Sequence, residues 1–513
     1  MNIKITYKWL LDYLDTDATA YDLQKYLSLC GPSVETVEEK NGDYVLDIEI
    51  TSNRVDMASV FGIAQEAQAI LPQFGLKARL KENPLEKYRL QYNLREPEEE
   101  LPLDVEIRNQ GLVSRFTTMI LSNVKVGQAP DFIRERLELC DIRSINNVVD
   151  ISNYLMLSLG QPTHIFDYDA IGKHTMILRE SKKDEIITTL DDRKITLPGG
   201  DIVIEDGNGD LIDLCGIMGG LNSSVKESTA RVVLFVQTYN KVKIRRTSMT
   251  TGQRSVAATY FEKNLDEERV IPTLAYGSEL LEMYAGASRA SHLQDIYPNP
   301  LPGKTVVTSV SDIRRTMGVA IEADAAATIL ENLGFTVKRF EDNLEVGVPS
   351  WRRDDIETRA DIVEEVARVF GYFRLPNDIQ KTGYIKQPRD LEQLFHYQIE
   401  IKKLLRDLGL NEVMNYSMIS EDLIRALDGD PTEHLFITNT ISEEIKYLRT
   451  SIMPSLIKGI KDNEGRRDTL RFFEIAKVYQ RKQVGLPDEE FRLGIAVNTD
   501  FWELKGIVER ILA

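Results

Sequence analysis

VVDISNYLMLSLGQPTHIFDYD, residues 148–169, starts with a largely apolar run that is then broken by Gly160 and Pro162. Asparagine is a preferred helix N-cap and glycine a preferred helix stop. The pattern therefore predicts a buried helix that is capped near Asn146 or Asn147 and ends at Gly160. Three polar side chains lie in this apolar context: Asn153, Gln161 and His164.

His164 is one of only five histidines in the chain. A histidine beside an apolar helix is usually a structural residue with satisfied hydrogen bonds. The alternative is a pocket group that transfers a proton or donates a hydrogen bond, because the pKa of histidine lies near neutrality. No Ser/His/Asp set at a useful spacing accompanies it, so the spacing alone leaves both interpretations open.

The stretch LCGIMGG, residues 214–220, brings three glycines together after a predicted strand, and LNSSV follows it. It does not match the GxGxxG pattern and lacks the Lys-Ser/Thr pair of a P-loop. A structural tight turn is one interpretation. The other is that a ligand approaches the backbone closely here.

The composition is that of a globular chain of about three domains, with 513 residues, 42% hydrophobic and 28% charged. It contains no run of 18 apolar residues, and its first residues do not resemble a signal peptide. Three distant cysteines argue against a disulfide framework or a zinc site and favour a reducing, cytoplasmic compartment. The net charge of −18 argues against a broad phosphate-binding surface, although a local basic patch remains compatible with it.

Several further elements follow from local patterns. Thr19 and Asp22 form a capping-box signature for a helix that Gly31-Pro32 closes. The residues from Tyr44 to Ile50 alternate as in a strand. The region from Thr175 to Gln237 reads as β structure, with a Gly-Asn-Gly turn inside DIVIEDGNGDLIDL, and a helical stretch runs from about Asp266 to Met283.

Two polar stretches are predicted linkers, residues 81–102 and residues 381–388. Between them, residues 305–376 form a small α+β unit with helices near 324–333 and 357–370. The tail from Leu391 starts with an amphipathic helix. It ends in ELKGIVERILA without a C-cap or polar tail, so we expect the chain to be cut short there.

The stretch DDIETRADIVEEVARVFGY holds the densest group of carboxylates. At helical spacing its apolar side chains form one arc: Ile362, Val363, Val366, Val369 and Phe370. Asp361, Glu364 and Glu365 fall on the opposite face, and Asp355 lies just ahead of the helix. Crowded carboxylates are ligands that Mg²⁺ accepts together with water. The alternative is a solvated acidic face near a helix N-terminus.

KVKIRRTSMTTGQR is the clearest basic cluster, with five cations: Lys241, Lys243, Arg245, Arg246 and Arg254. It is compatible with phosphate binding and equally with a solvated helix start.

Several segments occur in register over some 400 residues: SINNVVDISNYLMLSLGQPTHIFDYDAI, CGIMGG, RSVAATYFEKNLD, SWRRDDIETRADIVEEVARVFGY, YLRTSIMPSLIKGIKDN and LRFFEIAKVY. Together they closely resemble the beta subunit of bacterial phenylalanyl-tRNA synthetase. The resemblance implies a partner alpha subunit in an α₂β₂ tetramer, in which the alpha subunit uses ATP to attach phenylalanine to tRNA(Phe). It implies that this chain's tail is a class II synthetase-like domain without working catalytic motifs.

The resemblance also implies two sites. A magnesium site at the alpha–beta contact maps onto Asp355, Asp361, Glu364 and Glu365. An editing pocket that hydrolyses tyrosyl-tRNA maps onto Asn153, His164, Gly216 and Ala257, within a region from Val113 to Ala287. Editing is useful because an apolar pocket cannot strongly reject an isostere that merely adds a hydroxyl. Gly216 and Ala257 are expected to leave space for the ring, and His164 to help place the aminoacyl end or the attacking water.

The chain departs from the family pattern in three places. Phe235 stands where a glutamate usually grips the tyrosyl hydroxyl, with Gln237 where a small residue is common, so we expect weakened editing. An inserted OB-fold domain is missing near residues 39–41. The C-terminal anticodon-binding domain and the end of the preceding domain are also missing.

These observations predict a multidomain α+β chain. The expected parts are an N-terminal α+β domain (1–80), an α/β editing-type domain (100–300), a winged-helix-like B5 domain (304–376) and an incomplete class II-like antiparallel-sheet domain (388–513). The predicted function is a non-catalytic beta subunit that supports phenylalanine–tRNA ligation. Its rivals are a stand-alone hydrolase of mischarged tRNA and a pure interaction scaffold.

Overall fold

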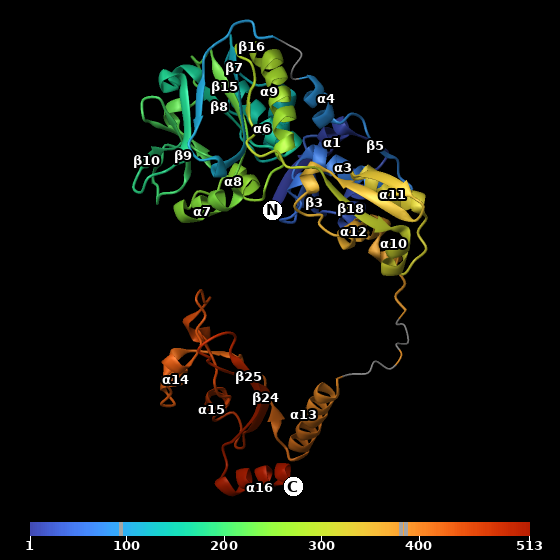
Figure 1. Cartoon of the computed structure of the whole chain (residues 1–513), viewed down its shortest axis with the longest axis vertical. Helices are drawn as coiled ribbons and strands as arrows, with labels where there is room; N and C mark the ends of the chain where they lie inside the picture. The colour runs from blue at the N-terminus through green and yellow to red at the C-terminus, as the bar shows by residue number, and fades with distance from the viewer. Residues whose placement is uncertain (92–95, 379–382, 384–387) are drawn as a thin grey trace. The chain divides into compact units, whose positions relative to one another are not determined.

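The computed structural model describes residues 1–91, 96–378, 383 and 388–513. The chain divides into two compact units, Met1–Asp378 and Ile379–Ala513 (Figure 1). Both units contain helices as well as strands, and the strands form several separate sheets. This confirms the predicted α+β class. Among the described residues, no helix is long and apolar enough to cross a membrane.

The first unit begins with a three-stranded antiparallel sheet. Its central strand, β4 (Asp43–Glu49), pairs with β1 (Asn2–Thr6) and β3 (Ser33–Lys40). Asn41 and Gly42, both with positive φ, make the two-residue turn between β3 and β4. Such a turn matches the twist of paired strands. The chain therefore runs directly through the point where the family resemblance led us to look for an inserted domain.

Three helices accompany this sheet: α1 (Tyr7–Tyr13), α2 (Ala20–Cys30) and α3 (Val60–Ile70). The predicted capping box starts α2, where the Asp22 amide donates to Thr19 Oγ1 at 3.1 Å and the Thr19 amide donates to Asp22 Oδ2 at 2.9 Å. Helix α3 is buried along most of its length, because α1, α2 and three later helices all pack against it.

Two five-stranded sheets form the middle of the first unit (Figure 1). The first has the order β14-β13-β12-β9-β6, with bounds Met218–Gly219, Leu211–Leu214, Ile202–Asp206, Thr175–Glu180 and Asp104–Ile107. The second has the order β16-β7-β15-β8, with β17 also on β7; the bounds are Ser288–Arg289, Val113–Ser122, Val232–Tyr239, Thr163–Asp167 and Gln294–Ile296.

Helices α6 (Asn147–Leu159) and α9 (Val270–Ala285) cover one face of the second sheet. Asn146 caps α6 and Gly160 ends it with φ +74°, as predicted. Strand β15 is buried at every position, and its first five residues, VVLFV, are a continuous apolar run. His164 follows α6 directly but lies on strand β8, where it pairs with Phe235 of β15.

The first predicted linker is partly wrong. Residues 84–91 form helix α4 (Pro84–Gln91), which packs against α9. Leu85 and Tyr88, three residues apart, are buried, and the Tyr88 ring stacks on Tyr276 at 4.7 Å between centroids. Two apolar residues in a charged stretch were too weak a signal to predict this helix. Most of the second predicted linker, residues 381–388, lies outside the described residues.

Residues 304–370 form a small unit of three strands and three helices. Strands β18 (Lys304–Ser309) and β19 (Thr336–Phe340) pair with β20 (Asn343–Val348). The two predicted helices are present as α11 (Ala323–Asn332) and α12 (Arg359–Phe370). Sequence analysis missed α10 (Val310–Met317), a short helix whose buried residues recur at helical spacing.

The second unit is built on a long β-hairpin, β24 (Arg471–Gln480) with β25 (Asp488–Val497). The predicted amphipathic helix is α13 (Arg389–Asp407), and its buried Leu405 joins a small core with Phe473 of β24. The remaining helices of eight residues or more in the described part of this unit are α15 (Met453–Asp462) and α16 (Phe501–Leu512).

Candidate functional site

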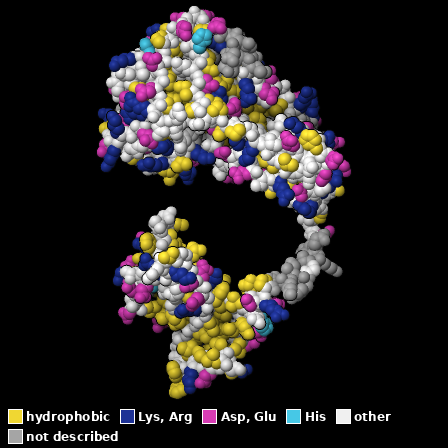
Figure 2. Space-filling model, in the orientation of Figure 1, with side chains coloured by type: hydrophobic (Ala, Val, Ile, Leu, Met, Phe, Trp, Pro, Cys, Tyr) yellow, Lys and Arg dark blue, Asp and Glu magenta, His cyan; other side chains and the backbone are white. Residues whose placement is uncertain are grey.

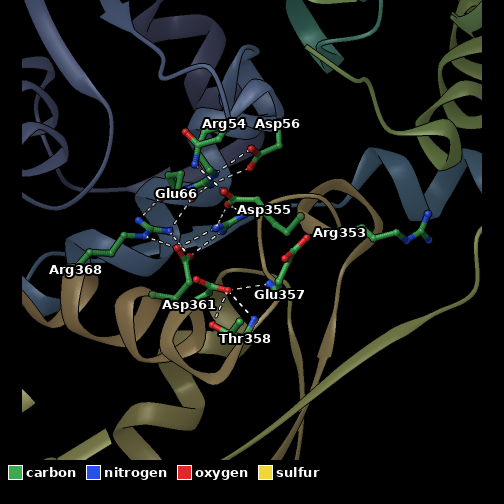
Figure 3. A network of polar contacts seen from close by, with 12 residues as sticks. Arg54, Asp56, Glu66, Arg353, Asp355, Glu357, Thr358, Asp361 and Arg368 are labelled. Carbon is green, nitrogen blue, oxygen red and sulfur yellow. Dashed lines mark hydrogen bonds and ion pairs between the residues drawn. The ribbon is translucent and has the colours of Figure 1, made fainter. Parts of the chain in front are cut away.

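A buried ionic network joins the N-terminal helices to α12 (Figure 3). We use this name for six side chains: Arg54, Asp56, Glu66, Arg352, Glu365 and Arg368. Arg368 bridges the two sides, with Nη1 2.7 Å from Glu66 Oε2 and Nη2 2.6 Å from Glu365 Oε2. Arg352 holds both oxygens of Glu365, at 2.8 and 2.9 Å. Three arginines thus balance three carboxylates.

The side chains of the ionic network stay ionised because each carboxylate is paired with an arginine. Burial by itself would raise the pKa of Glu66, yet the charges of Arg368 and Arg54 lower that pKa to about 2. Burial likewise opposes ionisation of Glu365, but Arg368 and Arg352 hold its pKa well below the usual range. Both carboxylates therefore stay ionised at neutral pH.

The four predicted magnesium ligands line one cavity of about 520 Å³ beside this network. Their oxygens are largely committed to protein. Glu365 is bound by two arginines, and Asp355 is bound by Arg352 and by Asn53 Nδ2 at 2.7 Å. Asp361 Oδ2 accepts from the backbone amides of residues 357 and 358, as the N3 member of the α12 capping box, and Glu364 is exposed.

In this arrangement the four carboxylates do not fit a resident magnesium ion. Among the described residues, no group of three or more His, Cys, Asp or Glu side chains is placed to hold a metal. The prediction also placed Glu365 on an open acidic face, and that was wrong, because Glu365 is 4% exposed. Helix α12 is covered on a second side by α2 and α3, and periodicity cannot show a second contact surface made of charged groups.

The four predicted editing residues converge on a second cavity, of about 510 Å³. Asn153 comes from α6, His164 from β8, Gly216 from the turn between β13 and β14, and Ala257 from α8 (Val256–Phe261). Its walls are mostly apolar, which suits an aromatic or aliphatic ligand group.

His164 is half-buried, and its Nε2 atom is sealed from solvent without a hydrogen-bond partner among the described residues. Its ring meets Phe166 edge-on at 4.4 Å between centroids. Burial lowers the pKa of His164 to about 4. At neutral pH the ring is uncharged and can donate or accept a hydrogen bond toward the cavity.

The glycines near the cavity have two different roles. Gly216 has φ +68°, and a Cβ there would lie 2.9 Å from Ile244 and 3.0 Å from Tyr239. Gly216 is therefore required by the turn, and its missing side chain opens no space for a ring. At Gly219 a Cβ would lie 2.4 Å from Cε1 of His164, so this glycine is what lets the histidine ring sit against the strand. Sequence analysis noted the three glycines but could not tell which one the histidine contacts.

Phe235 does not line the cavity. Its ring is fully buried between Phe116 and Phe166, at 4.7 and 5.8 Å between centroids. Gln237, two residues along the same strand, does line the cavity, and its Oε1 has no hydrogen-bond partner in the described part of the chain. Phe235 therefore does not contact a ligand in the cavity, and weakened editing stays a prediction.

Asp213 of β13 is a cavity residue that sequence analysis missed. It is 3% exposed, and burial raises its pKa to about 7, against a smaller opposing effect of the Cys215 thiol. The only available signal was a single acidic residue in the otherwise apolar strand LIDL.

The basic cluster lies on and just after α7 (Lys241–Thr251), and part of it is neutralised. Lys243 pairs with Glu180 at 2.6 Å, and Lys241 and Arg245 have longer contacts with acids, at 3.4 and 3.5 Å. Arg246 and Arg254 are exposed and have no ion pair with any described residue. This leaves a smaller positive surface than the five cations suggested.

Comparison with known proteins places these features in one family. Family models match in succession: the B3/4 domain over residues 112–286, the tRNA synthetase B5 domain over 306–372 and the phenylalanyl tRNA synthetase beta chain CLM domain over 376–513. A phenylalanine–tRNA ligase beta subunit of Rhodopirellula baltica is 31% identical over 515 residues, covering 99% of this chain and 73% of that protein. The chain belongs to the phenylalanine–tRNA ligase beta subunit family.

Another relative is similar over most of this chain. The beta subunit of Carboxydothermus hydrogenoformans is 33% identical over 503 residues, covering 94% of this chain. The chain spans 60% of the length of that relative. Among solved structures, an N-terminal fragment of the phenylalanyl-tRNA synthetase beta subunit from Pyrococcus horikoshii matches 72% of this chain and 100% of that chain, at 14% identity and a TM-score of 0.42.

Arg368→Met tests the ionic network. The change leaves Glu66 and Glu365 with one buried arginine partner fewer, which we expect to lower the free energy of unfolding of the first unit by about 3–5 kcal/mol. Urea unfolding of the full chain measures this. Arg339→Met is the matched control, because the Arg339–Asp324 pair is exposed and should contribute less than about 1 kcal/mol. Equal effects of the two variants would contradict the role assigned to the network.

Asp361→Ala and Glu364→Ala separate a helix cap from a metal ligand. Asp361→Ala removes the acceptor for two backbone amides and should cost about 1 kcal/mol. Glu364→Ala should stay within about 0.5 kcal/mol, because the side chain is exposed. Unfolding of the full chain with and without millimolar Mg²⁺ is the measurement. Stabilisation of the wild type by Mg²⁺ that both variants abolish would restore the metal assignment.

His164 should make the stability of the fold depend on pH. Its folded pKa of about 4 lies below the unfolded value of 6.5, so between these values the unfolded chain binds the extra proton. Stability should therefore rise with pH from 4 to 6.5, by at most about 1.4 kcal/mol per unit, and then level off. His164→Gln should flatten this rise in chemical unfolding curves, whereas the exposed His292→Gln should not. A slope that survives in His164→Gln would refute the assignment.

Proposed function

We propose that this chain is the non-catalytic beta component of a phenylalanine–tRNA ligase and supports charging of tRNA(Phe) by an alpha subunit that binds ATP and phenylalanine. The observation that carries the proposal is the family membership over nearly the whole chain, with three domain types in succession. We further propose an α₂β₂ assembly and retain the four-part division at residues 1–80, 100–300, 304–376 and 388–513.

Exposed apolar side chains of the second unit support a protein partner. Hydrophobic side chains gather over one face of this unit (Figure 2). Large exposed apolar residues of this unit include Met414, Tyr416, Ile441, Val484, Leu486 and Trp502. Contiguous exposed apolar surface of this kind is typical of an interface. It favours a subunit of an assembly over a stand-alone hydrolase.

For the cavity we propose hydrolysis of a mischarged aminoacyl-tRNA. Water adds across the ester bond, so that the free amino acid leaves as a carboxylic acid and the ribose hydroxyl regains its proton. A role for His164 in holding the water or the ester by a hydrogen bond is supported by its neutral ring and by its buried Nε2, which has no described partner. Gly219 keeps the ring in position. Arg246 on α7 and Arg254 between α7 and α8 are both exposed. Their positive charges could bind the phosphates of an RNA end.

The test is reconstitution with an alpha subunit from the same genome. The purified chain alone should give no phenylalanine-dependent pyrophosphate exchange, and the reconstituted complex should give exchange and charge tRNA(Phe). Robust exchange by the chain alone would contradict the non-catalytic role. Failure to bind any alpha subunit, with deacylation of tyrosyl-tRNA intact, would favour the stand-alone hydrolase. If the chain neither binds an alpha subunit nor deacylates tyrosyl-tRNA, the result would favour a pure interaction scaffold.

A further inference from the structure

Asp213 lies on the wall of the editing-type cavity and faces into it. In the antiparallel pair of β13 and β14 it stands directly opposite Gly219. Directly opposed residues of such a pair project to the same side of the sheet. A Cβ at Gly219 would meet the His164 ring. The Asp213 side chain therefore projects from the same side of the sheet on which His164 lies. Because the opposite residue is a glycine, no cross-strand side chain covers the Asp213 carboxyl.

The carboxyl has no cation. No arginine, lysine or histidine among the described residues forms an ion pair with it, and the thiol of Cys215 is a hydrogen-bonding side-chain neighbour. A buried carboxyl without a cation is expensive, and in a core it would be expected to have several hydrogen-bond donors. Asp206, the last residue of the neighbouring strand β12, shows this ordinary arrangement: it accepts from the amides of Gly172, Asn208 and Asp210.

One further polar atom of the cavity wall, Oε1 of Gln237, lacks a hydrogen-bond partner among the described residues. The hydroxyl of Tyr239, which interacts with Cys215 and Gln237, is not among the groups that line the cavity. The rest of the wall is mostly apolar. An apolar cavity with a few unsatisfied, inward-facing polar groups is typical of a site that binds an apolar ligand carrying one polar group.

We propose that Asp213 is the specificity-determining residue of this cavity and hydrogen-bonds a hydroxyl on the aromatic side chain of the bound aminoacyl group. The inference rests on the proposed hydrolytic function. Asp213 would then be the hydrogen-bond partner of a phenolic hydroxyl in the cavity. Phe235 cannot have this role, because its ring lies outside the cavity. A site that hydrogen-bonds a substrate hydroxyl disfavours the analogue that lacks it, because its own polar groups are then left unpaired.

The carboxyl serves this role in either charge state. Its ionised form accepts a hydrogen bond from a phenol, and its protonated form donates one to the phenolic oxygen. Because its pKa is about 7, both forms are present at neutral pH. The preference for a hydroxylated ring should therefore persist on both sides of pH 7.

Asp213→Leu distinguishes a binding residue from a structural one, because the two roles predict opposite changes in stability. Leucine removes a buried carboxyl without a cation and projects into open space, so the unfolding midpoint of the full chain should shift upward. The preference for tyrosine over phenylalanine should fall by about tenfold to a hundredfold. Asp206→Asn is the matched control, and it should lower the midpoint and leave the preference unchanged.

Two assays measure the preference. The first is binding of L-tyrosine methyl ester against L-phenylalanine methyl ester to the full chain, by calorimetry or ligand-observed NMR. The second is deacylation of tyrosyl-tRNA(Phe) against phenylalanyl-tRNA(Phe) by the complex reconstituted with an alpha subunit. An unchanged tyrosine preference in Asp213→Leu, or a lowered midpoint with unchanged binding, would overturn the proposal.

The outcomes also separate this inference from the proposed function. If the wild type binds the tyrosine ester selectively, loses that selectivity in Asp213→Leu and deacylates nothing, the hydrolytic function fails and the recognition role stands. If the wild type deacylates and Asp213→Leu keeps the same tyrosine preference, the function stands and the role of Asp213 fails. Equal binding of both esters by the wild type also refutes the role of Asp213.

Discussion

The contact between Arg368 and the two carboxylates Glu66 and Glu365 is the constraint on which the first unit depends. It joins side chains that lie some 300 positions apart, and all three are buried or nearly so. Removing such ions from water is costly, and only close pairing with complementary charges offsets that cost. A poorly placed helix α12 would leave unpaired charges, so the network allows few alternative arrangements of α12 against α3.

The position of α3 also affects the editing-type cavity. Helix α3 packs against α6, which supplies Asn153. Just before α3, the carbonyl of Ala58 accepts from the Tyr260 hydroxyl at 2.8 Å, which ties down α8 and its Ala257. Two walls of the cavity are thus held by contacts with the same N-terminal segment. We infer that loosening the network would disturb the cavity even though no network residue lines it.

The sequence allowed some of this to be predicted. Caps and apolar periodicity predicted α2, α6 and α12, because those signals are local. The burial of Glu365 could not be predicted, since one apolar arc shows only one contact surface and the second surface here is made of arginines. Asn153 and Ala257 carry no local signal of a pocket, and only the family resemblance indicated them. The same resemblance drew attention to Phe235, whereas Gln237, two residues further along β15, is the one that lines the cavity.

The two sites bury charged groups in opposite ways. In the ionic network every carboxylate has an arginine, so Glu66 and Glu365 stay ionised and the arrangement favours one rigid structure. In the cavity, His164 and Asp213 have no such partners; burial lowers one pKa and raises the other, and both shift toward the neutral form. A fold selected for stability alone would replace Asp213 with an apolar residue, as its neighbours in β13 are. Its presence beside His164 is therefore best explained by a ligand that completes its hydrogen bonding, and the rigid network is what keeps that unsatisfied wall in place.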